Sequence, residues 1–203
     1  MRKKVFLVLG TFVLLVMLYL HSIDKDYYYK AVWYNLPGIF DENIFEVRTI
    51  AESEKIQPWP YSADFSKAHF SSELMDSLEK YKTTSVLFIQ HDSIIREHYF
   101  GGINDTTRSN SFSVAKGYIG ALVGRAIKLG YIKSVDQPVG DYIKEFDYGL
   151  KKHITIRHLL TMSSGLDWDE AYNSLFSQTT KSYYGSDLEK QVLGLNVIKT
   201  PGQ

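Results

Sequence analysis

The sequence predicts a domain of mixed α/β (α+β) class, in which an antiparallel hairpin is flanked by helices. Residues 85–90 form a continuous apolar strand pattern, residues 91–93 are typical of a turn, and residues 94–100 form a second strand pattern. Apolar residues recur at helical spacing in 71–82, just before the hairpin. A second long helix is predicted to begin after the hairpin, at Ser113.

This second helix is predicted to run to Leu129, with Gly130 as its C-cap. Its interior is rich in small residues, although a mid-helix glycine costs about 1 kcal/mol relative to alanine. The small residues are Ala115, Gly117, Gly120, Ala121 and Gly124. Such a composition predicts a buried, central helix with a closely packed neighbour.

Shorter elements are expected in the last part of the chain. The apolar spacing predicts short helices over 139–146 and 157–162, and a final helix over 187–195. The stretch 167–186 is polar and aromatic without a clear period, so we expect it to be irregular.

Composition excludes several classes of function. With 203 residues, 44% of them hydrophobic, the chain can build one real core. The formal net charge is zero, so the sequence lacks the excess of basic residues that is typical of proteins that bind nucleic acids. Cysteine is absent, which excludes thiol catalysis, cysteine-ligated zinc and disulfides. The six histidines do not form a His-Glu-x-x-His pattern, and we expect neither a metal site nor a cofactor.

The N-terminus predicts contact with a membrane. Arg2, Lys3 and Lys4 precede an apolar run over 5–20, and no small-x-small cleavage site follows it. We interpret residues 1–23 as an uncleaved signal-anchor that leaves the rest of the chain in the periplasm or outside the cell. A cleaved signal peptide, and therefore a secreted protein, is the alternative.

An aromatic-rich approach segment is predicted over 24–61, and the folded domain is predicted over 62–203. Aromatic rings just after the anchor suit the membrane–water interface, where tyrosine and tryptophan are enriched. Packing of these rings onto the folded domain is an equally good explanation.

The pattern Ser-x-x-Lys occurs three times, at Ser22–Lys25, Ser77–Lys80 and Ser113–Lys116. The first lies at the end of the apolar run, and the second lies on a predicted amphipathic helix. The third lies between the hairpin and the small-residue helix, which is the context that nucleophilic catalysis needs.

A serine hydroxyl is a weak nucleophile until a base takes its proton. Lys116 lies about one helical turn from Ser113, and a lysine at a buried helix start is favoured as the neutral amine, which can act as that base. Free N–H groups at the helix start can also face a developing oxyanion. The alternative is a serine N-cap followed by a surface lysine.

The sequence around this pair resembles the class C branch of the serine β-lactamase family. That branch includes penicillin-binding carboxypeptidases, esterases and 6-aminohexanoate-oligomer hydrolases. The resemblance lies in NSFSVAK (110–116), ALV (121–123), VDQPV (135–139) and ITIRHLLTMSSGL (154–166). The segment SGLDWDEAY (164–172) is most similar to the 6-aminohexanoate hydrolase-like members.

The resemblance implies a β-lactamase/transpeptidase-like fold, with an antiparallel sheet flanked by helices and a helical domain. It implies Ser113 as the acylated nucleophile, Lys116 as its base, and hydrolysis of a small-molecule amide or ester without a cofactor. It also implies that Tyr172 contacts substrate, although an ordinary loop tyrosine is an equal alternative. Near it, Asp167, Asp169 and Glu170 are expected to belong to a capped, solvated loop rather than to a cation site.

The sequence also departs from the family pattern. The second motif of the family, Tyr-x-Asn or Tyr-x-Ser, normally follows a Pro-Gly such as Pro201-Gly202 within a few residues, and a Lys/His-Thr-Gly strand comes later. Neither is present. We therefore expect the fold to be truncated before the later sheet strands. A non-catalytic, membrane-tethered binding module that retains the first half of the fold is the alternative function.

Overall fold

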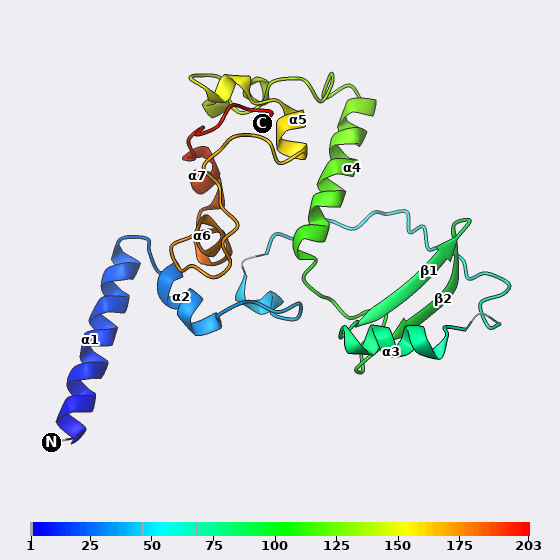
Figure 1. Ribbon diagram of the computed structural model, residues 1–203, viewed down its shortest axis with the longest axis horizontal. Helices are drawn as coiled ribbons and strands as arrows, with labels where there is room; N and C mark the ends of the chain where they lie inside the picture. Colours follow the sequence, from blue (N-terminus) through cyan, green and yellow to red (C-terminus); the bar gives the residue numbers. More distant parts are fainter. Residues whose placement is uncertain (1, 46, 68) are drawn as a thin grey trace. The chain divides into compact units, whose positions relative to one another are not determined.

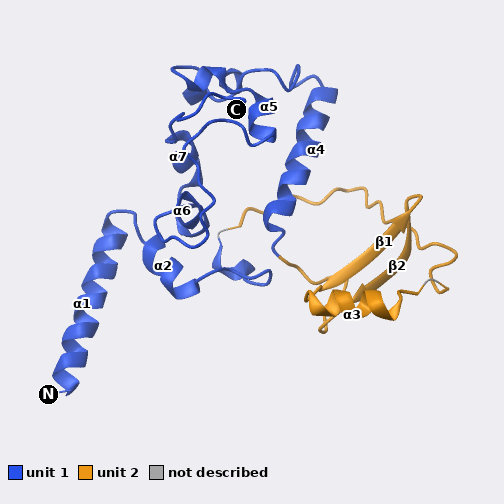
Figure 2. Ribbon diagram, in the orientation of Figure 1, with its two compact units in different colours: residues 1–45, 110–203 blue, residues 46–109 orange. Residues whose placement is uncertain are grey.

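The computed structural model describes residues 2–45, 47–67 and 69–203. The chain forms two compact units, drawn in different colours in Figure 2. Unit 1 comprises Met1–Phe45 and Asn110–Gln203, and unit 2 comprises Glu46–Ser109.

Unit 2 contains the predicted hairpin and the helix before it (Figure 1). Strands β1 (Ser85–Gln90) and β2 (Ser93–Tyr99) pair antiparallel, and α3 (Ser72–Lys80) precedes them. The hydroxyl of Ser71 accepts a hydrogen bond from the backbone N–H of Leu74, which caps the start of α3. The two strands and this helix confirm the sequence prediction, with bounds that shift by one or two residues.

The turn between the strands is formed by His91 and Asp92, both of which have positive φ (49° and 57°). Two residues with positive φ suit the right-handed twist of a hairpin, because this conformation matches the twist of the flanking strands. The register of the hairpin shifts between Phe88 and Ile89.

The core of unit 1 lies around Ile154, whose side chain is fully buried. It packs with Val139, Phe146 and Ile156 in one apolar cluster. Helix α5 (Ile156–Leu160) is capped by the side chain of Thr155, which accepts from the N–H of His158. The chain enters this core through an antiparallel bridge between Pro138 and Thr155.

The prediction of one helix over 139–146 is wrong. The structure has two 3₁₀ turns there, η3 (Val139–Asp141) and η4 (Lys144–Phe146), and the backbone between them is extended at Ile143. Both Val139 and Phe146 are buried in the same cluster. The backbone folds back so closely that a Cβ on Gly140 would lie 2.9 Å from the Cα of Asp147. A third turn, η5 (Lys151–His153), completes this region.

The last part of unit 1 holds two short helices. Helix α7 (Leu188–Leu193) confirms the expected final helix, although it is shorter than predicted. Helix α6 (Gln178–Tyr184) lies inside the stretch expected to be irregular, and that expectation is wrong for these residues. Ser177 caps α6, because its hydroxyl accepts from the N–H of Thr180.

The N-terminal part of unit 1 contains α1 (Arg2–Ser22), which is long and apolar enough to cross a membrane. Helix α2 (Tyr27–Tyr34) follows and packs on α6, with Tyr27 and Ala31 buried against Tyr184. Of the two explanations for the aromatic segment, packing onto the folded domain therefore explains the burial of Tyr27 and Ala31. A short turn, η1 (Glu42–Ile44), comes next.

Helix α4 (Ala115–Lys128) follows a single 3₁₀ turn, η2 (Phe112–Val114), and confirms the predicted helix. Gly130 lies just beyond its end with a φ of +80°. The expectation that this helix is buried is wrong, because α4 contains no buried residue. Added Cβ atoms would meet nothing within 4 Å at Gly117, Gly120 and Gly124. Among the residues that the structure describes, no neighbour packs against these glycines.

The packing of Ile154 gives the first prediction. Ile154→Ala should destabilise the chain by about 2–4 kcal/mol, because it removes buried methyl groups and leaves a cavity. Leu150→Ala is the matched control, since Leu150 lies nearby and is 62% exposed. Chemical denaturation of the full chain in detergent micelles measures the difference. If Ile154→Ala and Leu150→Ala lowered the free energy of unfolding by the same amount, Ile154 would not be at the centre of the core.

A second prediction concerns the ion pair that joins α5 to the loop before η3. Arg157 donates from Nε and Nη2 to the two carboxylate oxygens of Asp136, at 2.6 and 2.9 Å. These hydrogen bonds hold the pKa of Asp136 below its ordinary value of 3.8. A lowered pKa gives stability that is present above the ordinary value and is lost as the pH falls through the folded value.

Asp136→Asn should therefore be less stable than the natural chain at pH 7, and the gap should close below pH 3.8. Asp147→Asn, which removes another exposed aspartate of unit 1, is the control, and an equal gap for it would contradict a specific role for the pair of Asp136 and Arg157. Thermal denaturation across this pH range measures both variants. A gap for Asp136→Asn that is the same at every pH would refute the role of its charge.

Candidate active site

The turn that presents Ser113 is held by contacts within unit 1. The backbone N–H of Asn110 donates to the carbonyl of Ile39 at 2.7 Å, and its side-chain amide donates to the carbonyl of Gly38 at 3.2 Å. Phe112 has a φ of +44°, which is rare for an aromatic residue. The chain thus enters η2 in a fixed, sharply turned conformation immediately before Ser113.

Within this turn, Ser113 and Lys116 are brought together as their spacing predicts. The Nζ of Lys116 donates a hydrogen bond to the Oγ of Ser113 at 2.8 Å. Both residues are exposed, and the side chain of Lys116 retains 49% of its accessible surface. The sequence predicts that this helix start is buried, and that prediction is wrong for the described part of the chain.

The other two Ser-x-x-Lys patterns form different contacts. The hydroxyl of Ser22 donates to the carbonyl of Tyr19 at 2.7 Å, and that of Ser77 donates to the carbonyl of Glu73 at 2.8 Å. Both hydroxyls are thus bound to the backbone of their own helix. The geometry therefore distinguishes Ser113 from two serines that have the same local sequence pattern.

A carboxylate also lies near the pair. The Oε1 of Glu170 is 3.8 Å from the Nζ of Lys116, and both side chains are exposed. Sequence reasoning placed Glu170 in a solvated loop and missed this contact, because no local spacing links two residues so far apart in the chain. The loop itself is capped as expected: Asp167 accepts from the N–H of Asn196 at 2.8 Å.

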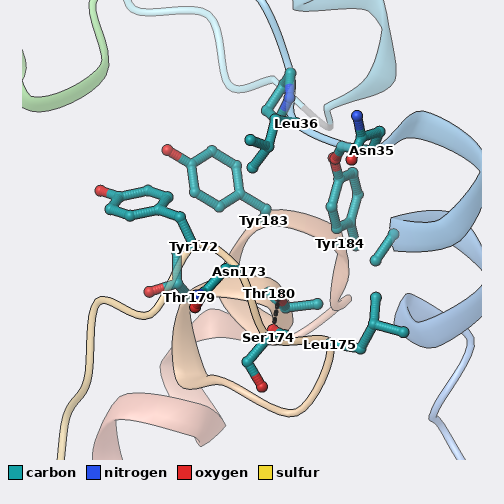
Figure 3. A pocket seen from close by; sticks show the side chains of 12 residues that line it. Asn35, Leu36, Tyr172, Asn173, Ser174, Leu175, Thr179, Thr180, Tyr183 and Tyr184 are labelled. Atoms are coloured by element: carbon teal, nitrogen blue, oxygen red, sulfur yellow. Dashed lines mark hydrogen bonds between the residues drawn. The ribbon is translucent and has the colours of Figure 1, made fainter.

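A cavity of about 390 Å³ lies between α2, α6 and the loop that precedes α6 (Figure 3). The rings of Tyr172 and Tyr183 both line it. Phe112 and Tyr183 are in aromatic contact, with ring centroids 6.4 Å apart, so one wall of the cavity adjoins the turn that presents Ser113. Burial raises the pKa of Tyr183, and the nearby Tyr172 and Glu170 raise it further.

Tyr172, the residue expected to contact substrate, is thus placed at this cavity and near Glu170. Tyr183 was not singled out by sequence reasoning, since it lies in the stretch expected to be irregular. Among residues 2–45, 47–67 and 69–203, no group of three or more His, Cys, Asp or Glu side chains is placed to hold a metal ion.

A known family matches a large part of the chain. The model of the family described as Beta-lactamase matches residues 72–203, well over half of the chain. The chain belongs to the β-lactamase family. The resemblance predicted from the sequence is thereby confirmed, and Ser113 and Lys116 lie inside the matched region.

Two individual proteins are similar to this family member. An uncharacterized protein from Alkalihalophilus pseudofirmus is 36% identical over 105 residues, which cover 47% of this chain and 30% of that protein. A candidate 6-aminohexanoate-dimer hydrolase from Bacillus anthracis aligns in structure with a TM-score of 0.50. It is 16% identical, and the alignment covers 73% of this chain and 44% of that chain.

The structural likeness confirms the predicted β-lactamase-like fold of mixed class, with helices and a small antiparallel sheet. The match spans less than half of either similar protein's own length. Their names therefore describe proteins longer than the segment that is shared.

The contacts of Asn110 give the third prediction. Asn110→Ala removes the side-chain hydrogen bond to Gly38 and should loosen the turn before Ser113. The rate at which Ser113 reacts with an acylating probe should fall about tenfold, because reaction rates depend steeply on orientation. Labelling of the full chain in membranes, followed over time, measures this rate.

Asn104→Ala is the matched control, since the side chain of Asn104 also caps a local turn, by accepting from the N–H of Thr106, but belongs to unit 2. It should leave the labelling rate unchanged. If Asn110→Ala and Asn104→Ala are both labelled at the natural rate, the hydrogen bond between Asn110 and Gly38 does not position Ser113.

Proposed function

We propose that this member of the β-lactamase family is a serine hydrolase that cleaves a small-molecule amide or ester through an acyl-enzyme intermediate. Ser113 is the nucleophile, Lys116 is its general base, and Tyr172 contacts substrate. The proposal rests above all on the 2.8 Å contact between the Nζ of Lys116 and the Oγ of Ser113 at the head of α4. Membership of a family of hydrolases supports the reaction class.

The first step forms the acyl-enzyme. The Nζ of Lys116 donates to Oγ in the structure; in this step the hydrogen bond reverses, the neutral amine accepts the proton of the Ser113 hydroxyl across the same separation, and Oγ attacks the substrate carbonyl carbon. The carbonyl oxygen becomes an oxyanion, which the N–H groups at the start of α4 can stabilise. When the tetrahedral intermediate collapses, the bond to the leaving amine or alcohol breaks, and Lys116 returns the proton to that group.

The second step releases the product. A water molecule gives a proton to the Lys116 amine and attacks the ester carbonyl of acylated Ser113. The carbon–Oγ bond breaks, the acid leaves, and Oγ regains its proton from Lys116. No cofactor is needed in either step. The cavity beside the turn, with Tyr172 and Tyr183 on its wall, is a suitable place for part of the substrate.

We further propose that α1 anchors this hydrolase in a membrane, with its basic end inside and the two units in the periplasm or outside the cell. Its 21 residues rise about 30 Å, which matches the hydrocarbon core of a bilayer. Arg2, Lys3 and Lys4 lie at one end only, as the positive-inside rule requires of the inner end.

One observation favours a second function, a membrane-tethered binding module without catalysis. Lys116 is exposed and lies 3.8 Å from the carboxylate of Glu170. Glu170 thus gives Lys116 an ion-pair partner other than Ser113, and such a surface ion pair needs no catalytic role. Under this alternative, the cavity at Tyr172 and Tyr183 binds a ligand that is not cleaved.

The fourth prediction separates the two functions. A fluorescent fluorophosphonate should label the natural chain in membranes, and Ser113→Ala should abolish the label. Lys116→Ala should slow labelling about 10²- to 10⁴-fold, the range over which a general base contributes. A fluorescent penicillin, used in parallel, tests whether the substrate is a β-lactam.

Ser77→Ala and Lys80→Ala are matched controls, because they alter the same sequence pattern on α3, where the hydroxyl bonds to its own helix. Both should label at the natural rate. Labelling that survives Ser113→Ala unchanged would disprove the nucleophile. Absence of any labelling in the natural chain would favour the binding module.

A further inference from the structure

A second, more apolar hollow lies where α1 meets α2. It has a volume of about 820 Å³ and is open to the outside. One wall is formed by α1 residues between Phe12 and Leu20, and the other by α2 together with Leu175 and Phe176. The cavity of about 390 Å³ is lined instead by Ala31 of α2, by Asn35 just after this helix and by α6, and Leu175 borders both hollows.

Helix α2 has two different faces. Tyr27 and Ala31 are buried against α6, whereas Val32 and Trp33 are exposed, with Trp33 retaining 84% of its accessible surface. The exposed rings and methyl groups of Trp33 and Val32 leave a large apolar surface in contact with water. The Trp33 ring suits the boundary between headgroups and acyl chains, where its apolar body and its N–H are both satisfied.

The loop before α6 extends this face. Phe176 is 82% exposed, and its ring contacts that of Tyr28 edge to face, with centroids 5.5 Å apart. Leu175 lies beside it and is also exposed. We call Val32, Trp33, Leu175 and Phe176 the apolar collar. Two of its residues come from α2 and two come from a loop far along the chain.

The position of the groove on α1 identifies what fills it. Its α1 wall extends from Leu20 back to Phe12, about 12 Å along the helix axis. If α1 spans a bilayer and ends near Ser22, this wall lies within the outer leaflet. Trp33 and Phe176 form the facing wall of the same groove. Lipid that surrounds this part of α1 would therefore also contact these two residues.

We infer that the apolar collar inserts into the outer lipid leaflet and that lipid acyl chains occupy the groove. The inference rests on the membrane anchoring in the proposed function. Its consequence is that unit 1 is held to the membrane at two places, α1 and the collar. Since Tyr184 of α6 packs on α2, the cavity between α2 and α6 is then held close to the lipid surface. The hydrolase would therefore act on substrates close to the membrane.

Tryptophan fluorescence in vesicles tests this inference, since the chain contains only Trp33, Trp59 and Trp168. Trp59→Phe combined with Trp168→Phe leaves Trp33 as the sole emitter. The full chain is reconstituted into phosphatidylcholine vesicles whose acyl chains carry bromine, a contact quencher, near the carbonyl end. Trp33 emission should fall about twofold or more relative to unbrominated vesicles, because interfacial rings lie at that depth.

The control retains Trp168 instead, through Trp33→Phe and Trp59→Phe, because Trp168 lies outside the groove lining. Its emission should be the same in both kinds of vesicle. Equal quenching of Trp33 and Trp168 would overturn the collar as the specific contact. Unchanged Trp33 emission would overturn it outright. Shielding of Trp33 from iodide that grows with the protein-to-lipid ratio would instead identify a second copy of the chain as the occupant.

Two readouts on the same vesicles separate this inference from the proposed function. Resistance to alkaline extraction reports the insertion of α1, and fluorophosphonate labelling reports Ser113. An inserted, labelled chain with unquenched Trp33 contradicts only the collar. A quenched Trp33 without labelling contradicts only the hydrolase. Extraction at alkaline pH contradicts both the anchor and the collar.

Discussion

The packing of Tyr184 against α2 is the contact on which the placement of the N-terminal part of unit 1 depends. Its ring is buried and stacks on that of Tyr34, with centroids 6.1 Å apart, and its hydroxyl donates to the carbonyl of Asn35. Asn35 ends α2 with a φ of 57° and turns the chain toward Gly38. Gly38 and Ile39 then hold Asn110 before the turn that presents Ser113. One aromatic contact thus connects the proposed membrane segment with the candidate active site.

The elements predicted correctly are those that local spacing determines. The hairpin, α3 and α4 follow from side-chain periodicity over a few turns or strands, which neighbouring residues are sufficient to set. The contact between Lys116 and Ser113 is of the same kind, because residues three apart share a helix face. The family was predictable for a related reason, since its motifs are short runs of adjacent residues around these same elements.

The features that sequence reasoning missed depend on contacts between distant segments. Helix α6 has a polar, aromatic sequence without a clear period, and its burial comes from α2. The proximity of Glu170 to Lys116 requires the loop before α6 to lie against the start of α4. The two 3₁₀ turns over 139–146 arise because Val139 and Phe146 must both reach Ile154. None of these constraints is visible in the spacing of one segment.

The exposure of α4 bears most directly on catalysis. Each of its internal glycines costs helix stability, and no described residue approaches Gly117, Gly120 or Gly124 closely enough to explain that cost. Tyr118 and Leu122 on the same helix are exposed as well. Covering this helix would also exclude water from the contact between Lys116 and Ser113. The Nζ of Lys116 and the Oγ of Ser113 are already within hydrogen-bond distance, so the proposed attack by Ser113 depends on the exclusion of water from this exposed helix start more than on the geometry of the pair.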